Sequence, residues 1–600
     1  MIKISVNLCV PCVSVLKNPL FVPPKGEKQH RDTECTELHR GFPSHIAHRI
    51  SHIAILLLLL SQAAIAQKYA VHFKDKDRTP YQLDAPSQFL SERALERRYK
   101  FEILLSDDDL PVNPAYIQQV ADKGATILFP SKWLNCVLVD CDDDAAIDDI
   151  KTLGCVERVV LVAHPRGREG NTDNTDDTDF HRCKYTYQQY ENQCESVSSV
   201  SSAFQFYGNA SDQIEQLNGI ALHNKGYDGE GVLIAVLDGG FCNVNTIDAF
   251  AHLYESGRLL MAKDFIEPGG DIYRSGITEH GTSVLSCMAA YLPNRMVGTA
   301  PKASYCLFRT ENTLSEYLIE EYTWVIGAET ADSIGADLIN SSLVYTKYDD
   351  PTMSHTYSDM DGRTTIAAIG ARKAVERGIF VCTSAGNEGD NVAWRWIGTP
   401  ADVAEALTVG AVQQNGQYAS FSSIGPNAAG EQKPNVMARG ADATIINAQG
   451  AIISGSGTSY SSPIVCGMVA CLLQASPFTP PEKLKTLIES SANLYANPSY
   501  QMGYGIPDFN KTLKSLPVPG HSKCNNILVY PNPASGLLTV KSQYHLEKAL
   551  LYDFSGRLVA EQLLEKYHYT IATQELRAGM YVIHFYDDEG MVGCAKFVKN

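Results

Sequence analysis

The sequence predicts an α/β fold, built on a doubly wound and mostly parallel sheet, with smaller domains of other classes on either side. Between residues 206 and 514, short apolar runs alternate with helical patterns, which is typical of parallel strands covered on both faces. Residues 67–163 mix strand and helix patterns and predict a small α+β domain. Residues 525–600 contain only short alternating runs between turn signals and predict an all-β sandwich.

Composition narrows the function classes. Six hundred residues with 44% hydrophobic content can form several domains with buried cores. A formal net charge of −18 argues against binding to nucleic acid or to an anionic membrane. The cysteines are scattered, and no C-x-x-C pair follows residue 66, so the pattern indicates neither a disulfide framework nor a zinc or redox motif.

An export signal precedes the first folded domain. The apolar run over residues 53–66 is about 14 residues long, too short to span a bilayer comfortably. Histidine and arginine side chains precede it, and small residues in an A-x-A pattern end it before Gln67. We therefore interpret residues 45–66 as a signal peptide, and residues 1–44 as a mis-assigned or disordered leader.

The α+β domain is expected to follow the order strand, helix, helix, strand, strand, helix, strand. Its first helical pattern covers residues 87–100, with Ser87 as a candidate N-cap, and the second helix ends at Gly124. No residue of this domain suggests catalysis. Residues 164–205 lose apolar periodicity and are rich in Asp, Asn, Thr and Ser, which indicates a polar linker.

The large α/β domain contains two long helical patterns, at residues 316–335 and 364–378. A Pro/Gly linker over residues 515–524 separates this domain from the all-β sandwich. The expected strands of the large domain are residues 232–238, 305–310, 336–343, 378–385 and 405–412, and those of the sandwich lie within 527–542, 548–564, 567–573 and 579–600.

Four polar residues occupy positions at which the large domain could assemble a catalytic site. Asp238 ends an apolar strand, where open α/β sheets place their sites, and His280 opens a helical stretch. Ser459 precedes an apolar helix whose first turn is expected to contain Pro463. Each alone is more often a turn, structural or capping residue. Together they supply a nucleophile, a base and a group that orients the base, and the amide of Asn387 could stabilise an oxyanion.

The blocks VLDGG, HGTSV, SAGNEG and GTSYSSP occur in this order, and here the chain resembles the subtilase family of serine endopeptidases over about residues 220–510. The resemblance implies that Ser459 is the nucleophile, that His280 is the general base and then acid, and that Asp238 orients His280. Asn387 and the Ser459 N–H would stabilise the oxyanion during peptide hydrolysis through an acyl-enzyme. No cofactor is required for this chemistry; structural calcium is compatible with the family, but no ligand spacing assigns a site.

The same resemblance places the substrate beside Ser342, Leu343, Val344, Gly386 and Glu388. Members of the family usually have glycine at the position of Val344, so a branched side chain there is expected to narrow the primary pocket. Glu388 is expected to favour basic substrate side chains.

The flanking domains have resemblances of their own. Residues 67–163 are similar to subtilase prodomains in length, order and position, which implies an inhibitory propeptide; an independent interaction module is the alternative. Arg166 and Arg168 are candidate processing sites in the linker. VYPNPASGLLTV and LRAGMYVIHF, within residues 525–600, resemble the sorting domain of the Bacteroidota type IX secretion system; a carbohydrate- or protein-binding sandwich is the alternative.

We therefore predict a zymogen of a subtilisin-like serine endopeptidase that acts on proteins or peptides. It would be secreted, or carried to the outer surface of a Gram-negative bacterium of the Bacteroidota type, by the type IX secretion machinery. It would be neither an integral membrane protein nor a nucleic-acid binder. An inactive surface adhesin or scaffold of subtilase fold is the main alternative. A serine esterase would have a G-x-S-x-G elbow, whereas the sequence around Ser459 is GTSYS.

Overall fold

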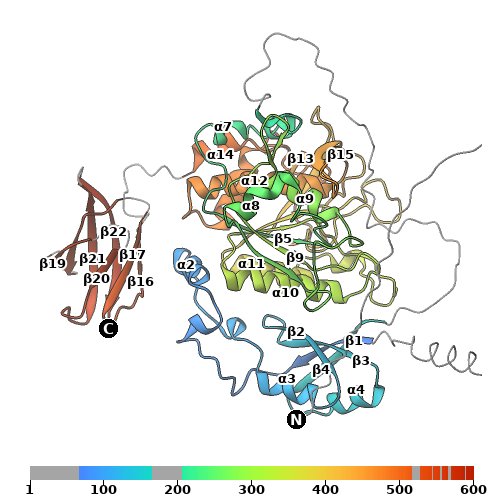
Figure 1. The fold of residues 1–600 in the computed structure, drawn as a ribbon, viewed down its shortest axis with the longest axis horizontal. Helices are drawn as coiled ribbons and strands as arrows, with labels where there is room; N and C mark the ends of the chain where they lie inside the picture. Colours follow the sequence, from blue (N-terminus) through green and yellow to red (C-terminus); the bar gives the residue numbers. More distant parts are fainter. Residues whose placement is uncertain are drawn as a thin grey trace, which may run out of the picture. The chain divides into compact units, whose positions relative to one another are not determined.

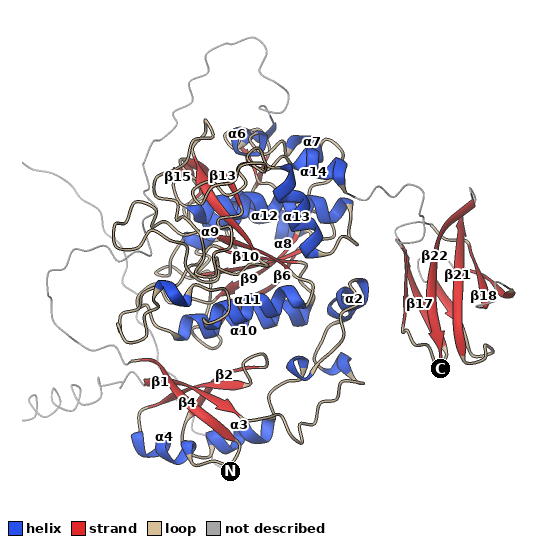
Figure 2. Ribbon diagram, turned by 180° about the vertical axis from the view of Figure 1, so that it is seen from behind, coloured by secondary structure: helices blue, strands red, loops and turns tan. Residues whose placement is uncertain are grey.

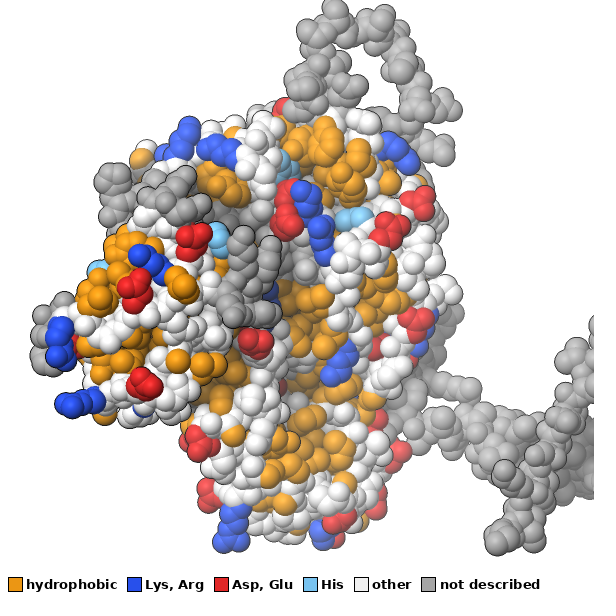
Figure 3. All heavy atoms as spheres, turned by 60° about the vertical axis from the view of Figure 1, so that its left-hand side comes forward, with side chains coloured by type: hydrophobic (Ala, Val, Ile, Leu, Met, Phe, Trp, Pro, Cys, Tyr) orange, Lys and Arg blue, Asp and Glu red, His pale blue; other side chains and the backbone are white. Residues whose placement is uncertain are grey.

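The computed structural model describes residues 67–164, 206–516, 527–542, 545–553, 557–564, 569–587 and 590–600. The predicted leader, signal peptide, processing sites and most of both linkers lie outside these residues. Within the described part of the chain, no helix combines the length and the apolar character needed to cross a bilayer. On the face drawn in Figure 3, acidic and basic side chains are interspersed among hydrophobic ones, without a broad basic patch.

The large domain is organised around a seven-stranded parallel sheet with the strand order β13-β12-β11-β10-β5-β9-β6 (Figure 1). Four of its five inner strands, from β12 to β5, are buried along their whole length, because helices cover both faces. The strands are β5 (Leu233–Asp238), β6 (Leu259–Asp264), β9 (Ser304–Arg309), β10 (Leu338–Ser341), β11 (Phe380–Ser384), β12 (Leu407–Val412) and β13 (Val436–Arg439).

Two pairs of helices enclose the sheet (Figure 2). Helices α9 (His280–Ala289) and α12 (Thr458–Ala475) lie in one hydrophobic core, and α10 (Ile319–Ile334) and α11 (Ile366–Glu376) lie in the other. The remaining elements are α6 (Ser211–Glu215), α7 (Ile220–His223), α8 (Ala251–Glu255), β7 (Tyr291–Leu292), β8 (Met296–Val297), β14 (Ala443–Ile446), β15 (Ile452–Gly455), α13 (Pro481–Ser491) and α14 (Phe509–Ser515).

The N-terminal α+β domain forms a four-stranded antiparallel sheet with the strand order β2-β3-β1-β4. One face of this sheet packs on α3 and α4, and the other face joins the hydrophobic core that contains α10. Its elements are β1 (Gln67–Phe73), α2 (Glu92–Lys100), α3 (Pro114–Ala121), β2 (Thr126–Ser131), β3 (Cys136–Cys141), α4 (Asp144–Lys151) and β4 (Val156–Ala163).

The C-terminal region forms two antiparallel sheets around one core, with the orders β16-β17-β20 and β19-β18-β21-β22. Its strands are β16 (Ile527–Tyr530), β17 (Leu537–Ser542), β18 (Lys548–Asp553), β19 (Leu558–Leu563), β20 (Tyr569–Ala572), β21 (Gly579–Asp587) and β22 (Gly590–Lys599). The predicted fold class, with an α/β domain between an α+β domain and a strand-rich sandwich, is confirmed.

Two local expectations need correction. The predicted cap Ser87 lies in a short turn of 3-10 helix, and α2 instead begins after Ser91, whose side chain accepts a hydrogen bond from the Ala94 N–H. The edge strand β6 was not predicted, because its apolar run covers only residues 259–262 and three of its six residues are exposed.

Candidate active site

Asp238 and His280 form a buried hydrogen-bonded pair. Asp238 is the last residue of β5 and is fully buried, and its Oδ1 and Oδ2 lie 2.9 and 3.1 Å from His280 Nδ1. His280 is the first residue of α9. A Cβ at the next position, Gly281, would lie 2.4 Å from the Gly240 carbonyl oxygen, so glycine is needed for the helix to approach the end of the strand. The carboxylate therefore fixes the orientation of the imidazole and holds the ring proton on Nδ1.

Ser459 is the second residue of α12. Pro463 lies in the second turn of this helix rather than in the predicted first turn. Proline has no N–H, so the Ser459 carbonyl lacks its usual intrahelical donor, and the Ser342 hydroxyl donates to it at 2.9 Å instead. The Ser459 hydroxyl itself donates to the Ser342 carbonyl at 3.4 Å. Because the intrahelical hydrogen bond is absent, the Ser459 backbone is instead hydrogen-bonded to the residue that follows β10.

Asn387 is oriented by the residue that precedes the serine. Its Oδ1 accepts hydrogen bonds from the Thr458 N–H at 2.9 Å and from the Thr458 hydroxyl at 3.0 Å. The hydroxyl of Thr458 is also the acceptor for the Gly386 N–H, at 3.1 Å. With its oxygen held in this way, Asn387 keeps its Nδ2 donor for the cleft that it lines.

A single cleft of about 530 Å³ contains His280, Asn387 and Ser459. It also contains four of the five predicted substrate-binding residues, while Leu343 is buried in the core beneath the cleft. A Cβ at Gly398 would lie 2.5 Å from Val344 Cγ1, so the valine side chain occupies space in this wall. The Glu388 carboxylate accepts a hydrogen bond from Asn391 Nδ2 at 2.6 Å.

Sequence reasoning missed a second part of the cleft wall. Two segments contribute to it: residues 313–316, which precede α10, and residues 346–349, which follow β10; Trp394 and Trp396 also line the cleft. These residues carry no catalytic motif. The only feature of the sequence that could have drawn attention to this part of the wall is the set of three closely spaced glutamates between residues 311 and 320.

Comparisons with known proteins identify the family that each of the three domains resembles. Residues 229–505 match the family model of the subtilases, residues 68–177 match a peptidase S8 propeptide domain of Bacteroidota, and residues 528–600 match a secretion system C-terminal sorting domain. The chain is 32% identical to subtilisin NAT of Bacillus subtilis subsp. natto over 297 residues, which is 49% of this chain and 68% of that protein.

Two further proteins align with about half of the chain. Subtilisin of Bacillus pumilus is 31% identical over 294 residues, covering 49% of this chain and 94% of that protein. A crystal structure of MycP1 with its N-terminal propeptide removed aligns with 52% of this chain and 98% of that chain, at 22% identity and a TM-score of 0.39.

Proposed function

Because this chain belongs to the subtilase family, we propose that it is an exported serine endopeptidase, made as a zymogen and active through Asp238, His280 and Ser459. The observation that carries the proposal is the buried pair of Asp238 and His280, whose imidazole faces the same cleft as Ser459. The alternative, an inactive adhesin or scaffold of subtilase fold, would not need a histidine that is buried and oriented by a carboxylate.

In the proposed mechanism, His280 removes the proton from Ser459 Oγ as this oxygen attacks the substrate carbonyl. Asp238 keeps the proton on Nδ1 and stabilises the imidazolium that forms. The Asn387 amide and the Ser459 N–H donate to the oxyanion; one such donor contributes about 10²–10³-fold to the rate. His280 then protonates the leaving amine, and water hydrolyses the acyl-enzyme.

The flanking domains support the zymogen and export parts of the proposal. A propeptide domain precedes the protease, and a secretion sorting domain follows it. We propose that the propeptide inhibits the enzyme until it is cleaved, and that the sorting domain directs the chain to the cell surface or the medium. For the substrate, we propose a primary pocket narrowed by Val344, which disfavours large aromatic side chains, and a preference for basic side chains from Glu388.

The test compares residues 67–600 with the Ser459→Ala variant of the same chain. The wild type is expected to lose its N-terminal domain, as read by intact mass, and to cleave casein. The variant is expected to do neither, with a loss of about 10³–10⁶-fold in rate. Labelling by a fluorophosphonate that requires Ser459 would separate an active enzyme from a scaffold; a folded wild-type protein that stays unlabelled and inert would refute the proposal.

A further inference from the structure

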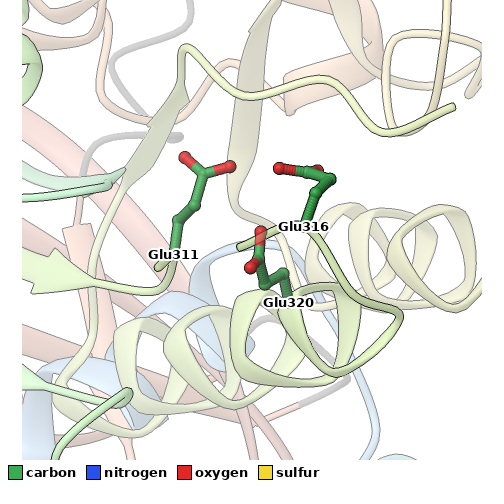
Figure 4. Close-up of side chains that lie close together, drawn as sticks. All are labelled: Glu311, Glu316 and Glu320. Atoms are coloured by element: carbon green, nitrogen blue, oxygen red, sulfur yellow. The ribbon is translucent and has the colours of Figure 1, made fainter. Parts of the chain in front are cut away.

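Three glutamate side chains converge beside the cleft (Figure 4). Glu311 follows β9, Glu316 lies in the loop before α10, and Glu320 is in the first turn of α10. One carboxylate oxygen of each residue lies within 4.8 Å of the corresponding oxygens of the other two. A single small cation placed between them would therefore contact all three carboxylates.

The cluster is largely buried, and none of its three glutamates forms an ion pair with another described residue. Glu311 is fully buried, Glu320 is 1% exposed, and Glu316 is half-buried. Both carboxylate oxygens of Glu311, and Oε2 of Glu320, have no hydrogen-bond partner among the described residues. Arg309, close in sequence, is already engaged by Asp264 at 2.9 Å. Burial of an uncompensated carboxylate costs several kcal/mol, and a cation bound between the three carboxylates would offset this cost.

A side chain outside the cluster, that of Tyr345, also lacks a hydrogen-bond partner among the described residues. Tyr345 is fully buried, and its hydroxyl oxygen has no hydrogen-bond partner within the described chain. The charges that act on this hydroxyl, and that raise its pKa together with burial, include those of Glu311, Glu320 and Glu316. An unsatisfied phenol next to unsatisfied carboxylates indicates a polar space that lacks its occupant.

We propose that Glu311, Glu316 and Glu320 bind one divalent cation of the calcium type. The ligands are all hard carboxylate oxygens, each able to coordinate through one or both atoms, and Ca²⁺ takes six to eight such oxygens in flexible geometry. No histidine or cysteine belongs to the cluster, which disfavours zinc. Because Glu316 is half-buried and lines the cleft, water can complete the coordination shell.

The ion would act on substrate binding. It would tie the loop that carries Glu316 to the first turn of α10, and this loop forms the part of the cleft wall made by residues 313–316. This consequence rests on the proposed peptidase function, whereas cation binding does not. In the active enzyme, removal of the ion is expected to raise KM for long peptides more than it lowers kcat.

The test uses residues 67–600 with Ser459→Ala, so that neither autolysis nor the success of the peptidase proposal affects the result. The protein is stripped with a chelator and titrated with Ca²⁺ by calorimetry, and with Tb³⁺ by tyrosine-sensitised luminescence. We expect Glu316→Gln and Glu320→Gln each to lose one equivalent of Ca²⁺ or to weaken that site by at least about tenfold. The matched control, Glu255→Gln on exposed α8, is expected to bind like the parent.

The melting temperature of the metal-free proteins shows whether each variant folds. If the folded Glu316→Gln and Glu320→Gln proteins bind as much Ca²⁺ as the parent, with the same affinity and the same thermal shift, the proposal is wrong. It is also wrong if they bind Ca²⁺ normally and, with Ser459 restored, lose a preference for peptides with Lys or Arg. In that case the cluster receives a basic substrate side chain instead of a metal ion.

Discussion

The two ends of helix α10 bury carboxylates in opposite ways. Near its C-terminus, Asp332 is fully buried and lies 2.5 Å from Arg97, 3.1 Å from Arg98 and 2.9 Å from Lys132, all from the propeptide domain. These cations lower the pKa of Asp332 to about 2 despite burial. At the N-terminus, Glu320 has no such partner, and burial with repulsion from Glu316 and Glu311 raises its pKa.

The difference between the two ends shows that the propeptide domain compensates the buried charges at the C-terminal end of α10. Glu329, one turn before Asp332, accepts hydrogen bonds from the Ser131 hydroxyl at 2.5 Å and from the Trp133 N–H at 2.9 Å. The buried carboxylates in the C-terminal half of α10 therefore have their partners in the propeptide domain, and they would become solvated if the propeptide left as proposed. At the N-terminal end, His355 pairs with Glu321, but no described ion pair includes Glu320 or the two glutamates beside it, which is why we infer an ion for these three.

The largest expected change in unfolding free energy comes from removing the charge of Asp332, at the C-terminal end of α10. Asp332→Asn removes the carboxylate that pairs with Arg97 and Lys132, whereas Arg98 keeps Asp109 at 2.7 Å. The unprocessed Ser459→Ala zymogen should therefore lose about 3–5 kcal/mol of unfolding free energy. Urea denaturation, monitored by tryptophan fluorescence, measures this loss. A change below about 1 kcal/mol would mean that water reaches these groups and that the network does not hold the propeptide.

A pH effect of intermediate size is expected at His72. This residue of β1 is 3% exposed. Its Nδ1 lies 3.3 Å from the Leu134 carbonyl, which can only accept, so its Nε2 is the acceptor for the Tyr322 hydroxyl of α10 at 3.1 Å. Burial, with the nearby Arg158, lowers its pKa from 6.5 to about 4. Its contribution is therefore fully present above pH 6.5 and is lost as pH falls from 6.5 toward 4, because the unfolded state binds the proton first.

The zymogen should accordingly lose up to about 1.4 kcal/mol per pH unit across this window through His72. His72→Gln keeps an acceptor for Tyr322 and removes the titration. The measurement is unfolding free energy at several pH values for both proteins. Parallel curves between pH 4.5 and 6.5 would exclude His72 as the source of the pH dependence.

A smaller effect with the opposite tendency is expected at the uncompensated end. In chelator, Glu311→Gln removes a buried charge that has no partner, so the metal-free Ser459→Ala zymogen should keep or gain about 1 kcal/mol of unfolding free energy. Urea denaturation in EDTA provides the value. A loss as large as that of Asp332→Asn would show that the protein itself compensates the charge of Glu311.

The smallest change in unfolding free energy is expected for an exposed ion pair, which serves as the baseline for the buried charges. Lys123 and Asp149 lie 3.1 Å apart on the propeptide surface, with 34% and 64% of their side chains exposed. Lys123→Ala should change the unfolding free energy by less than about 1 kcal/mol, and the change should shrink further at high salt. A change equal to that of Asp332→Asn would mean that burial does not explain the difference between the charges.

The sequence by itself determined the fold class and the candidate triad. Buried parallel strands need continuous apolar runs, and helices need periodic ones, so both leave a local pattern. Asp238, His280 and Ser459 each sit beside glycines or at a helix start, and their order along the chain is a property of the sequence alone. The cap at Ser87 failed because two serines precede the same helix, and only backbone geometry selects Ser91.

The tertiary structure decided what lies between distant segments. The hydrogen bond from the Ser342 hydroxyl to the Ser459 carbonyl forms because Pro463 cannot donate to that carbonyl. Ser342 and Ser459 are far apart in the sequence, so no short stretch of sequence predicts this hydrogen bond. The pairing of Asp332 with Arg97 joins residues of two domains. The convergence of Glu311 with Glu320 depends on how the chain turns between β9 and α10. Charge compensation is a property of three-dimensional proximity in a low dielectric, so the sequence can show that a carboxylate exists but not whether its charge is compensated.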